Sequence, residues 1–352
     1  EEGGGSRVER VRRLMEPFVL RRRKRDVLTE MAAKIEQVAR LEMLEEQQKV
    51  YSRIIQRWKQ SKEAAAAAAE EQRAEEKSNK STGGGGIKRL KRGDSDAADT
   101  GQQKISNVFC ELRKAANHPL LVRSLFPEHT FDVIATQLHN SGFFGFECTK
   151  DQVLAEMASW SDFQLHRVCM EDRRLHKYAL AEPQIAASSK LQHLAQLLPR
   201  LKAEGHRVLL FSQWTTMLDI VEEFITNMGI NYLRLDGSTA VQERQALLDR
   251  YNKEEEILCF LLSTRAGGMG INLTAADTVI LHDVDFNPQI DRQAEDRCHR
   301  IGQTRPVTVL RLVSAGTVDE GIFKLAEEKS KMADEMLDED LGDEAEGVAG
   351  EE

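Results

Sequence analysis

The order of short apolar segments and amphipathic segments in residues 189–333 constrains the fold more than any other feature of the sequence. Runs rich in Val, Ile, Leu and Phe have the length of strands, at 207–212, 231–235, 257–263, 278–282 and 307–313. Segments with helical periodicity stand between and after them, at 215–228, 240–251, 289–301 and 318–332. Apolar strands that alternate with helices predict an α/β fold with a parallel sheet covered by helices on both faces.

Composition divides the rest of the chain into segments. We expect a basic, helical lead-in at residues 1–58 and a mostly helical segment at 105–188. Between them, residues 59–104 contain a six-alanine run, a four-glycine run and long polar stretches. Such a composition buries too little surface to fold, which predicts a disordered low-complexity insertion.

The distribution of charge decides whether a nucleic-acid partner is excluded. The chain has 49 basic and 58 acidic residues, and a net charge of −9 argues against phosphate binding when it is taken as one number. Residues 334–352 hold ten acidic residues and no Lys or Arg, and without them 49 basic residues face 48 acidic ones. The negative charge therefore belongs to a segment that we predict to be a disordered acidic tail, and DNA is not excluded.

Other classes of protein are disfavoured by short-range patterns. No unbroken apolar run exceeds six residues, whereas a membrane-spanning helix needs about twenty, so we expect no membrane partner. The five cysteines are far apart and form no C-x-x-C pair, which argues against a zinc site or a disulfide framework. We therefore expect no protein-bound metal in this chain.

Two arginines in the segment 291–303 are the strongest candidates for catalysis. Arg297 and Arg300 are three residues apart on the helix predicted at 289–301, and Gln293 lies four residues before Arg297, so all three are expected on one face. Two converging guanidinium groups can neutralise charge that develops on a transferring phosphoryl group. The alternative is a solvated helix with Arg–Asp pairs, which would be the usual interpretation of an isolated R-x-x-R.

A glycine-rich loop follows the most apolar predicted strand. The segment 263–273 contains Gly267, Gly268 and Gly270, which allow a ligand to approach the backbone closely and leave N–H groups for phosphate oxygens. A tight crossover from strand to helix would explain the same glycines. A dinucleotide fingerprint is disfavoured because the G-x-G-x-x-G spacing is absent.

Two further loops follow predicted strands and carry polar groups. Asp236 and Gly237 open one of them, for which an ordinary turn and helix cap is the simpler alternative. Ser212, Gln213 and Trp214 form the other, where the tryptophan is equally compatible with a place in the core. Ligand-binding loops in parallel sheets stand at the carboxyl ends of the strands, and all of these motifs fall there.

These motifs, in this order, resemble the C-terminal RecA-like lobe of superfamily 2 helicases, and more narrowly that of the Swi/Snf-type chromatin-remodelling ATPases. The resemblance rests on VLLFSQW at 208–214, LDGST at 235–239, STRAGGMGINLTAAD at 263–277, HDVDFNP at 282–288 and DRQAEDRCHRIGQ at 291–303. Two upstream landmarks, PFVLRR at 17–22 and LRKAANHP at 112–119, are similar to family landmarks as well. The segment 161–169 resembles the SMARCAD-type or FUN-type subgroup, whereas Met31-Ala32-Ala33-Lys34 departs from the Pro-Pro-Lys that the family usually shows.

The resemblance implies that residues 189–333 form the RecA-like lobe of an ATP-dependent translocase on double-stranded DNA. Arg297 and Arg300 would be arginine fingers, with Gln293 beside them, and ATP would be bound with the help of Gly268, Gly270, Asp236 and Gly237. Contacts to the DNA backbone are expected from six residues: Ser212, Gln213, Ser263, Thr264, Arg265 and Asn272. Nucleosomes or histones, the first RecA-like lobe of the same polypeptide and a nuclear location are also implied, and the basic run 88–92 is compatible with nuclear import.

The sequence contains no G-x-x-x-x-G-K-[ST] and no Asp-Glu-x-His motif. In the family these motifs hold the nucleotide phosphates and the Mg²⁺ ion and belong to the first lobe, so this chain alone is expected not to hydrolyse ATP. Two alternatives remain open. One is a repair translocase of the same wider family that acts on naked DNA, and the other is a non-catalytic lobe that binds only DNA or protein.

Overall fold

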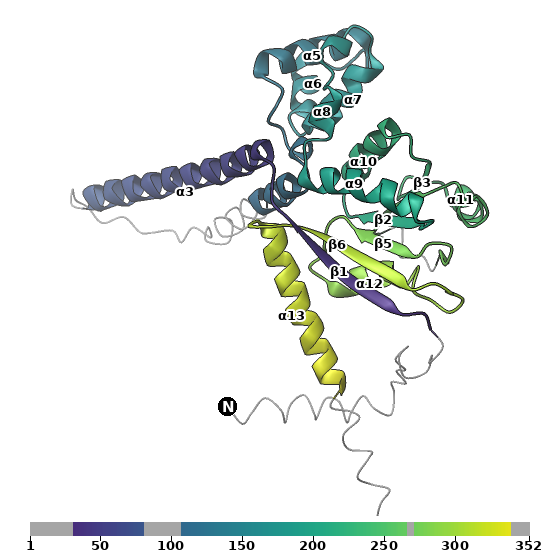
Figure 1. Ribbon diagram of the computed structural model, residues 1–352. Helices are drawn as coiled ribbons and strands as arrows, with labels where there is room; N and C mark the ends of the chain where they lie inside the picture. The colour runs from purple at the N-terminus through teal and green to yellow at the C-terminus, as the bar shows by residue number, and fades with distance from the viewer. Residues whose placement is uncertain (1–30, 81–106, 266–270, 339–352) are drawn as a thin grey trace, which may run out of the picture.

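The computed structural model describes residues 31–80, 107–265 and 271–338 (Figure 1). Its centre is a six-stranded sheet with the order β1-β6-β5-β2-β4-β3, in which every pairing is parallel. The strands are β1 Lys34–Leu41, β2 Val208–Ser212, β3 Tyr232–Leu235, β4 Cys259–Ser263, β5 Thr278–Leu281 and β6 Val307–Ser314. The predicted α/β fold with a parallel sheet is confirmed.

Alternate residues of the central strands enter two different cores. In β2, Val208 and Leu210 pack with α9 (Ser189–Ala203) and α10 (Thr215–Asn227) on one face of the sheet. Leu209 and Phe211 enter the core on the other face, together with residues of α11 (Val241–Lys253) and α12 (Pro288–Glu295). Because both faces are covered, these strands are apolar throughout, as the sequence pattern indicated.

The strand β1 was not expected, because the lead-in at 1–58 was predicted to be helical. Lys34–Leu41 pairs with β6 over its whole length, in the register Lys34↔Val307 to Leu41↔Ser314. As an edge strand it is largely exposed, so its residues lack the apolar run that marks the buried strands. Pairing with a strand about 270 residues later in the chain therefore determines its structure, and local preference does not.

The helix α3 (Glu45–Lys80) continues through the alanine run (Figure 1). Its first turns pack on the helix at 107–117, where Val50, Tyr51 and Ile54 meet Ala115 and Ala116. Residues 59–80 of the predicted disordered insertion thus belong to a helix. Residues 81–106, with the basic run 88–92, lie outside the described part of the chain, so disorder there stays a prediction.

A helical subdomain follows and has a core of its own. It consists of η2 Pro119–Leu121, α5 Glu128–Ser141, α6 Lys150–Met157, α7 Asp162–Glu171, η3 His176–Tyr178 and α8 Glu182–Ile185. This agrees with the helical expectation for 105–188. The segment 161–169, on which the subgroup resemblance rests, connects the subdomain to the sheet, because buried His166 of α7 contacts Glu223 of α10 (3.0 Å).

The last helix, α13 (Val318–Asp338), reaches five residues into the predicted acidic tail. The rest of that tail, 339–352, lies outside the described residues, as do residues 1–30 with the landmark at 17–22. Within the described segments, no helix is long and apolar enough to cross a membrane.

Candidate nucleotide and DNA site at the carboxyl ends of the strands

The parallel register brings the ends of β2, β4 and β5 together. Ser212 is paired with Ser263, and Phe211 with Leu281. One residue beyond, the amide of Thr264 donates to the carbonyl of Ser212 (3.1 Å). Three of the predicted DNA-contact residues, Ser212, Ser263 and Thr264, are therefore neighbours. All three side chains are buried, so these side chains do not form an exposed surface for DNA in this structure.

A buried carboxylate that the sequence analysis missed organises the loop after β2. Asp283 is fully buried and accepts hydrogen bonds from the Ser212 hydroxyl (2.5 Å) and the Gln213 amide (2.9 Å). Burial raises the pKa of Asp283, and these hydrogen bonds oppose that effect. The hydroxyl of Ser212 thus holds the loop in place. The HDVDFNP motif contained this residue, but its role depends on a contact between residues 71 positions apart.

A cationic and aromatic cluster stands beside this loop. Arg113 donates to the side-chain oxygen of Gln213 (3.2 Å) and to the carbonyl of Val284 (3.2 Å), and its guanidinium lies 5.1 Å from the ring centre of Phe286. Lys114 places its ammonium 5.3 Å from the ring centre of Trp214. The LRK landmark therefore adds two cations to the predicted contact surface.

Three buried donor atoms in this cluster have no hydrogen-bond partner within the described part of the chain. They are Nε of Arg113, Nε2 of Gln213 and Nε1 of Trp214. A buried donor without an acceptor costs about 1–3 kcal/mol, and each of these atoms is itself covered by protein. The half-buried cations Arg113 and Lys114 are the groups of this cluster whose charge suits phosphate oxygens.

A fully buried lysine ties four elements together. The ammonium of Lys190 (0% exposed) donates to Asn117 Oδ1 (2.7 Å), to the carbonyl of His282 (2.8 Å) and to Asp319 Oδ2 (2.6 Å). Asp319 also accepts from the amide of Ser314, at the end of β6 (3.3 Å). The start of α9, the end of the 107–117 helix, the end of β5 and the start of α13 are thereby fixed to each other.

The predicted helix at 289–301 is wrong in its second half. α12 ends at Glu295, and Arg297 and Arg300 lie in the turns that follow, so helical spacing does not place them on one face with Gln293. Contacts from another loop stop the helix, because the carbonyl of Arg297 accepts from the amide of Leu273 (3.1 Å). Gln293 is exposed on α12.

The two arginines are nevertheless close in space. Arg297 is half-buried and Arg300 is exposed. Burial lowers the pKa of Arg297, and the neighbouring charge of Arg300 lowers it further, as expected for guanidinium groups that approach each other. We call residues 296–300 the arginine turn. It concentrates positive charge at the surface.

Gln303 attaches the arginine turn to the loop after β4. Its side-chain nitrogen, in a residue that is only 7% exposed, donates to the carbonyls of Ala276 (2.7 Å), Thr274 (3.2 Å) and Cys298 (3.3 Å). The thiol of Cys298 also donates to Ala276 (2.9 Å). The HRIGQ ending thus positions the arginines through its glutamine.

The start of β1 and the residues just before it contact the end of α12 and the arginine turn. Lys34 and Arg311 each form an ion pair with buried Glu295, both at 2.5 Å. His299, within the turn, contacts the carbonyl of Ala32 (2.9 Å). The strand that leads into the sheet is therefore bonded to the end of α12 and to the turn itself.

The predicted nucleotide-binding residues are described only in part. Gly268 and Gly270 lie outside the described residues, whereas the flanking Arg265 and Asn272 are exposed. Asp236 is buried, accepts from the amide of Ser238 (2.9 Å) and pairs with Arg234 (2.7 Å). These bonds agree with the simple turn that was the alternative for Asp236, while Gly237 stays exposed.

Comparison with known proteins gives matches along the whole chain. The family model for the helicase conserved C-terminal domain matches residues 189–302, and that for the SNF2-related domain matches residues 1–121. "Protein CHROMATIN REMODELING 19" of Arabidopsis thaliana is 43% identical over 98% of the chain, and "ATP-dependent helicase fft2" of Schizosaccharomyces pombe is 39% identical over 92%. The chain spans 43% and 24% of these relatives' own lengths.

A solved structure covers nearly the same extent as this chain. It is described as the crystal structure of the C-terminal part of the Fun30 ATPase domain, and it matches with a TM-score of 0.71 and 31% sequence identity. The alignment covers 84% of this chain and 90% of that one. The resemblance to the FUN-type remodellers is therefore confirmed in both sequence and fold.

Proposed function

The chain belongs to the SNF2-related family of chromatin-remodelling ATPases that includes the Fun30 ATPase, and from this membership we propose that it is the C-terminal half of an ATP-dependent translocase on double-stranded DNA. In this proposal the chain supplies the second RecA-like lobe, and the Walker-type motifs and the Mg²⁺ ligands belong to a first lobe. The partners are DNA in nucleosomes, and the location is the nucleus.

The observation that carries the DNA part of the proposal is the cluster around Gln213. Two half-buried cations stand beside the loop after β2, where Arg113 donates to Gln213 and Lys114 lies over Trp214. Donors of this kind bind phosphate oxygens without reading the base sequence, as a translocase requires. Arg265 and Asn272, exposed after β4, extend this surface.

The observation that carries the nucleotide part is the arginine turn. An exposed guanidinium beside a half-buried one suits the phosphate end of a nucleotide, because two positive charges can balance the charge of a phosphoryl group in transfer. ATP with Mg²⁺ would supply the phosphoanhydride whose hydrolysis drives translocation. Arg297 and Arg300 would stabilise the transferring group, and Gln293, Gly268 and Gly270 would help to bind the nucleotide.

Arg300→Ala, in the polypeptide that carries both lobes, tests the arginine role. We expect DNA-stimulated ATP turnover to fall by about 10³-fold or more, because arginine fingers contribute on the order of 10³–10⁵ in rate. DNA affinity should be unchanged. Arg200→Ala is the matched control, since Arg200 is exposed on α9 and pairs only loosely with Glu204 (3.9 Å). Normal turnover with a loss of DNA binding would refute the role.

The division of labour between the lobes has a separate test. The 352-residue chain should bind DNA but show no DNA-stimulated release of phosphate, because the sequence lacks the Walker motif. Turnover by this chain would contradict that part of the proposal. Nucleosome sliding compared with translocation on naked DNA separates a remodeller from a repair translocase.

A further inference from the structure

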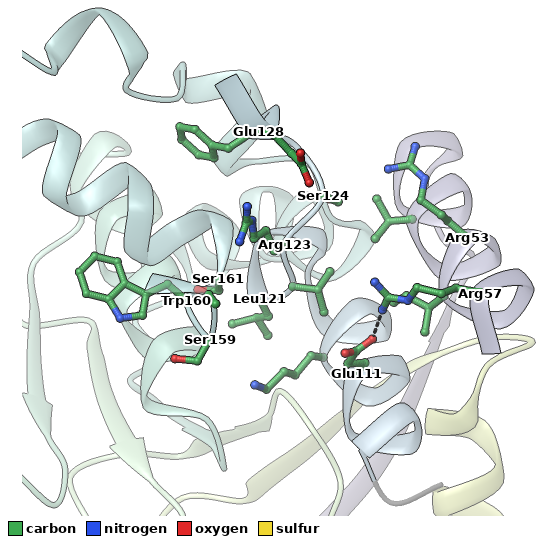
Figure 2. A pocket seen from close by; sticks show the side chains of 16 residues that line it. Arg53, Arg57, Glu111, Leu121, Arg123, Ser124, Glu128, Ser159, Trp160 and Ser161 are labelled. Atoms are coloured by element: carbon green, nitrogen blue, oxygen red, sulfur yellow. Dashed lines mark hydrogen bonds and ion pairs between the residues drawn. The ribbon is translucent and has the colours of Figure 1, made fainter. Parts of the chain in front are cut away.

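A large cleft lies between α3 and the helical subdomain and shares Lys114 with the cluster at the strand ends. Its volume is about 600 Å³, and it is open to solvent. Figure 2 shows Arg53 and Arg57 on α3 at one side, Arg123 near the centre, and Ser159, Trp160 and Ser161 at the other side. We call it the α3 cleft.

The α3 cleft is predominantly cationic. Its lining contains four basic residues, Arg53, Arg57, Lys114 and Arg123, and two acidic ones, Glu111 and Glu128. Arg57 and Glu111 form an ion pair in which both side chains are well exposed, at 65% and 42%, so the pair is screened by water and can open at little cost. Apart from this pair, the lining has three basic residues and one acidic residue.

One of these cations is held in place by packing. The guanidinium carbon of Arg123 lies 3.6 Å from the ring centre of Phe131, and Phe131 is buried. Stacking on an aromatic face fixes the plane of the guanidinium and leaves its edge N–H groups available to an acceptor. An anion in the cleft therefore meets a donor that loses little side-chain entropy on binding.

Lys114 connects the α3 cleft to the proposed DNA surface. It lines the cleft and also places its ammonium over Trp214, next to Gln213. Its neighbour Arg113 belongs to the strand-end cluster. The two cationic regions are thus continuous across the 107–117 helix, as expected for a single extended polyanion that touches both.

We propose that the α3 cleft binds phosphates of the same DNA duplex and extends its path from the strand ends to α3 and the helical subdomain. This inference rests on the proposed DNA-binding function. Arg53, on α3, and Arg123, near the centre of the cleft, each contact a phosphate, and Arg57 exchanges Glu111 for a third. The contacts are to backbone and carry no sequence preference.

The number of phosphate contacts is measurable through salt. Each neutralised phosphate releases counterions, and the plot of log affinity against log salt falls with a slope of about −0.9 per contact. Removing two contacts therefore reduces the steepness by about 1.8. In 0.1 M salt this corresponds to roughly 60-fold weaker binding, and the difference vanishes toward 1 M.

The experiment titrates a labelled 30-base-pair duplex with the 352-residue chain at several KCl concentrations. Arg53→Gln/Arg123→Gln should lower the slope and the affinity by the amounts above. Arg200→Gln/Lys202→Gln is the matched control, because it removes the same charge from exposed positions on α9, at the amino-terminal edge of the sheet. Glu128→Lys should strengthen binding, and misfolding cannot produce that result.

Two outcomes overturn the inference. If the cleft variant keeps the slope of the wild-type chain while Arg113→Gln lowers it, DNA binds at the strand ends only and the proposed function survives. If the cleft variant leaves the DNA titration unchanged but abolishes binding of a decaglutamate peptide, the cleft accepts an acidic protein segment. No DNA binding by the wild-type chain would count against the proposed function itself.

Discussion

The buried ion pair between Lys190 and Asp319 allows a sharp prediction about stability. Both side chains are at most 1% exposed, and Lys190 makes three hydrogen bonds of 2.6–2.8 Å. Lys190→Met keeps a long apolar side chain. It removes the ammonium donor, so the buried oxygens of Asp319 and Asn117 lose that hydrogen bond. Removing one partner of a buried pair costs about 3–5 kcal/mol because the other charge stays desolvated.

The expected loss is a large fraction of the whole stability, since small domains unfold with about 5–15 kcal/mol. The assay is urea unfolding of the 352-residue chain, followed by circular dichroism and by tryptophan fluorescence. Lys190→Met should lower the free energy of unfolding by about 4 kcal/mol. Lys202→Met, on the exposed side of the same helix, should change it by less than about 0.5 kcal/mol.

The double variant Lys190→Met/Asp319→Asn distinguishes a pair from two independent contacts. With both charges removed, the unpaired carboxylate no longer exists, so the double variant should be more stable than Lys190→Met alone. If the losses of the two single variants simply add, or if Lys190→Met costs less than about 1 kcal/mol, then the pair does not hold these elements together and the reasoning is refuted.

Three further predictions concern the arginine turn and a buried acid. Gln303→Leu in the two-lobe enzyme should reduce kcat by about tenfold or more with little change in DNA affinity, since positioning errors of about 1 Å can cost 10²-fold; equal activity would contradict its role. Lys34→Met should lower kcat in the same assay, and Lys34→Arg should restore it, because both cations can pair with Glu295; failure of the rescue would indicate a different role. Burial raises the pKa of Asp291 to about 8, above its value of 3.8 in an unfolded chain, so stability is lost as pH rises from about 4 to 8. The change in the free energy of unfolding that Asp291→Asn causes should therefore be several kcal/mol more favourable at pH 8.5 than at pH 5, as measured by urea unfolding. The same change at both pH values would exclude the buried acid as the cause.

The sheet was predictable because its central strands are buried on both faces. Four- to five-residue strands such as β2 and β4 leave a continuous apolar run in the sequence, and the helices between them leave their own period. The edge strand β1 leaves no such run, since most of its side chains are exposed and none is fully buried. Its structure depends on β6, which local sequence cannot reveal.

The site was predictable as a set of loops and less so as a set of contacts. The strand ends carried Ser212 and Gln213, as expected. The arginines instead follow α12, and their turn bonds to residues just before β1 and β5. The end of α12 was missed because Leu273, from the loop between β4 and β5, bonds to the carbonyl of Arg297. The buried acceptor Asp283 was missed for a related reason, since its partners stand about 70 residues away.

The pairing of β1 with β6 also sets an order for assembly. The ribosome releases β1 long before β6 exists, so this edge of the sheet stays open until the last strand emerges. Closing so long a loop costs entropy that grows only with the logarithm of its length, by about 0.6 kcal/mol for each doubling. Lengthening the chain between the two strands therefore costs little free energy. An alanine-rich helix or a whole helical subdomain can be inserted there without changing the pairing of the sheet.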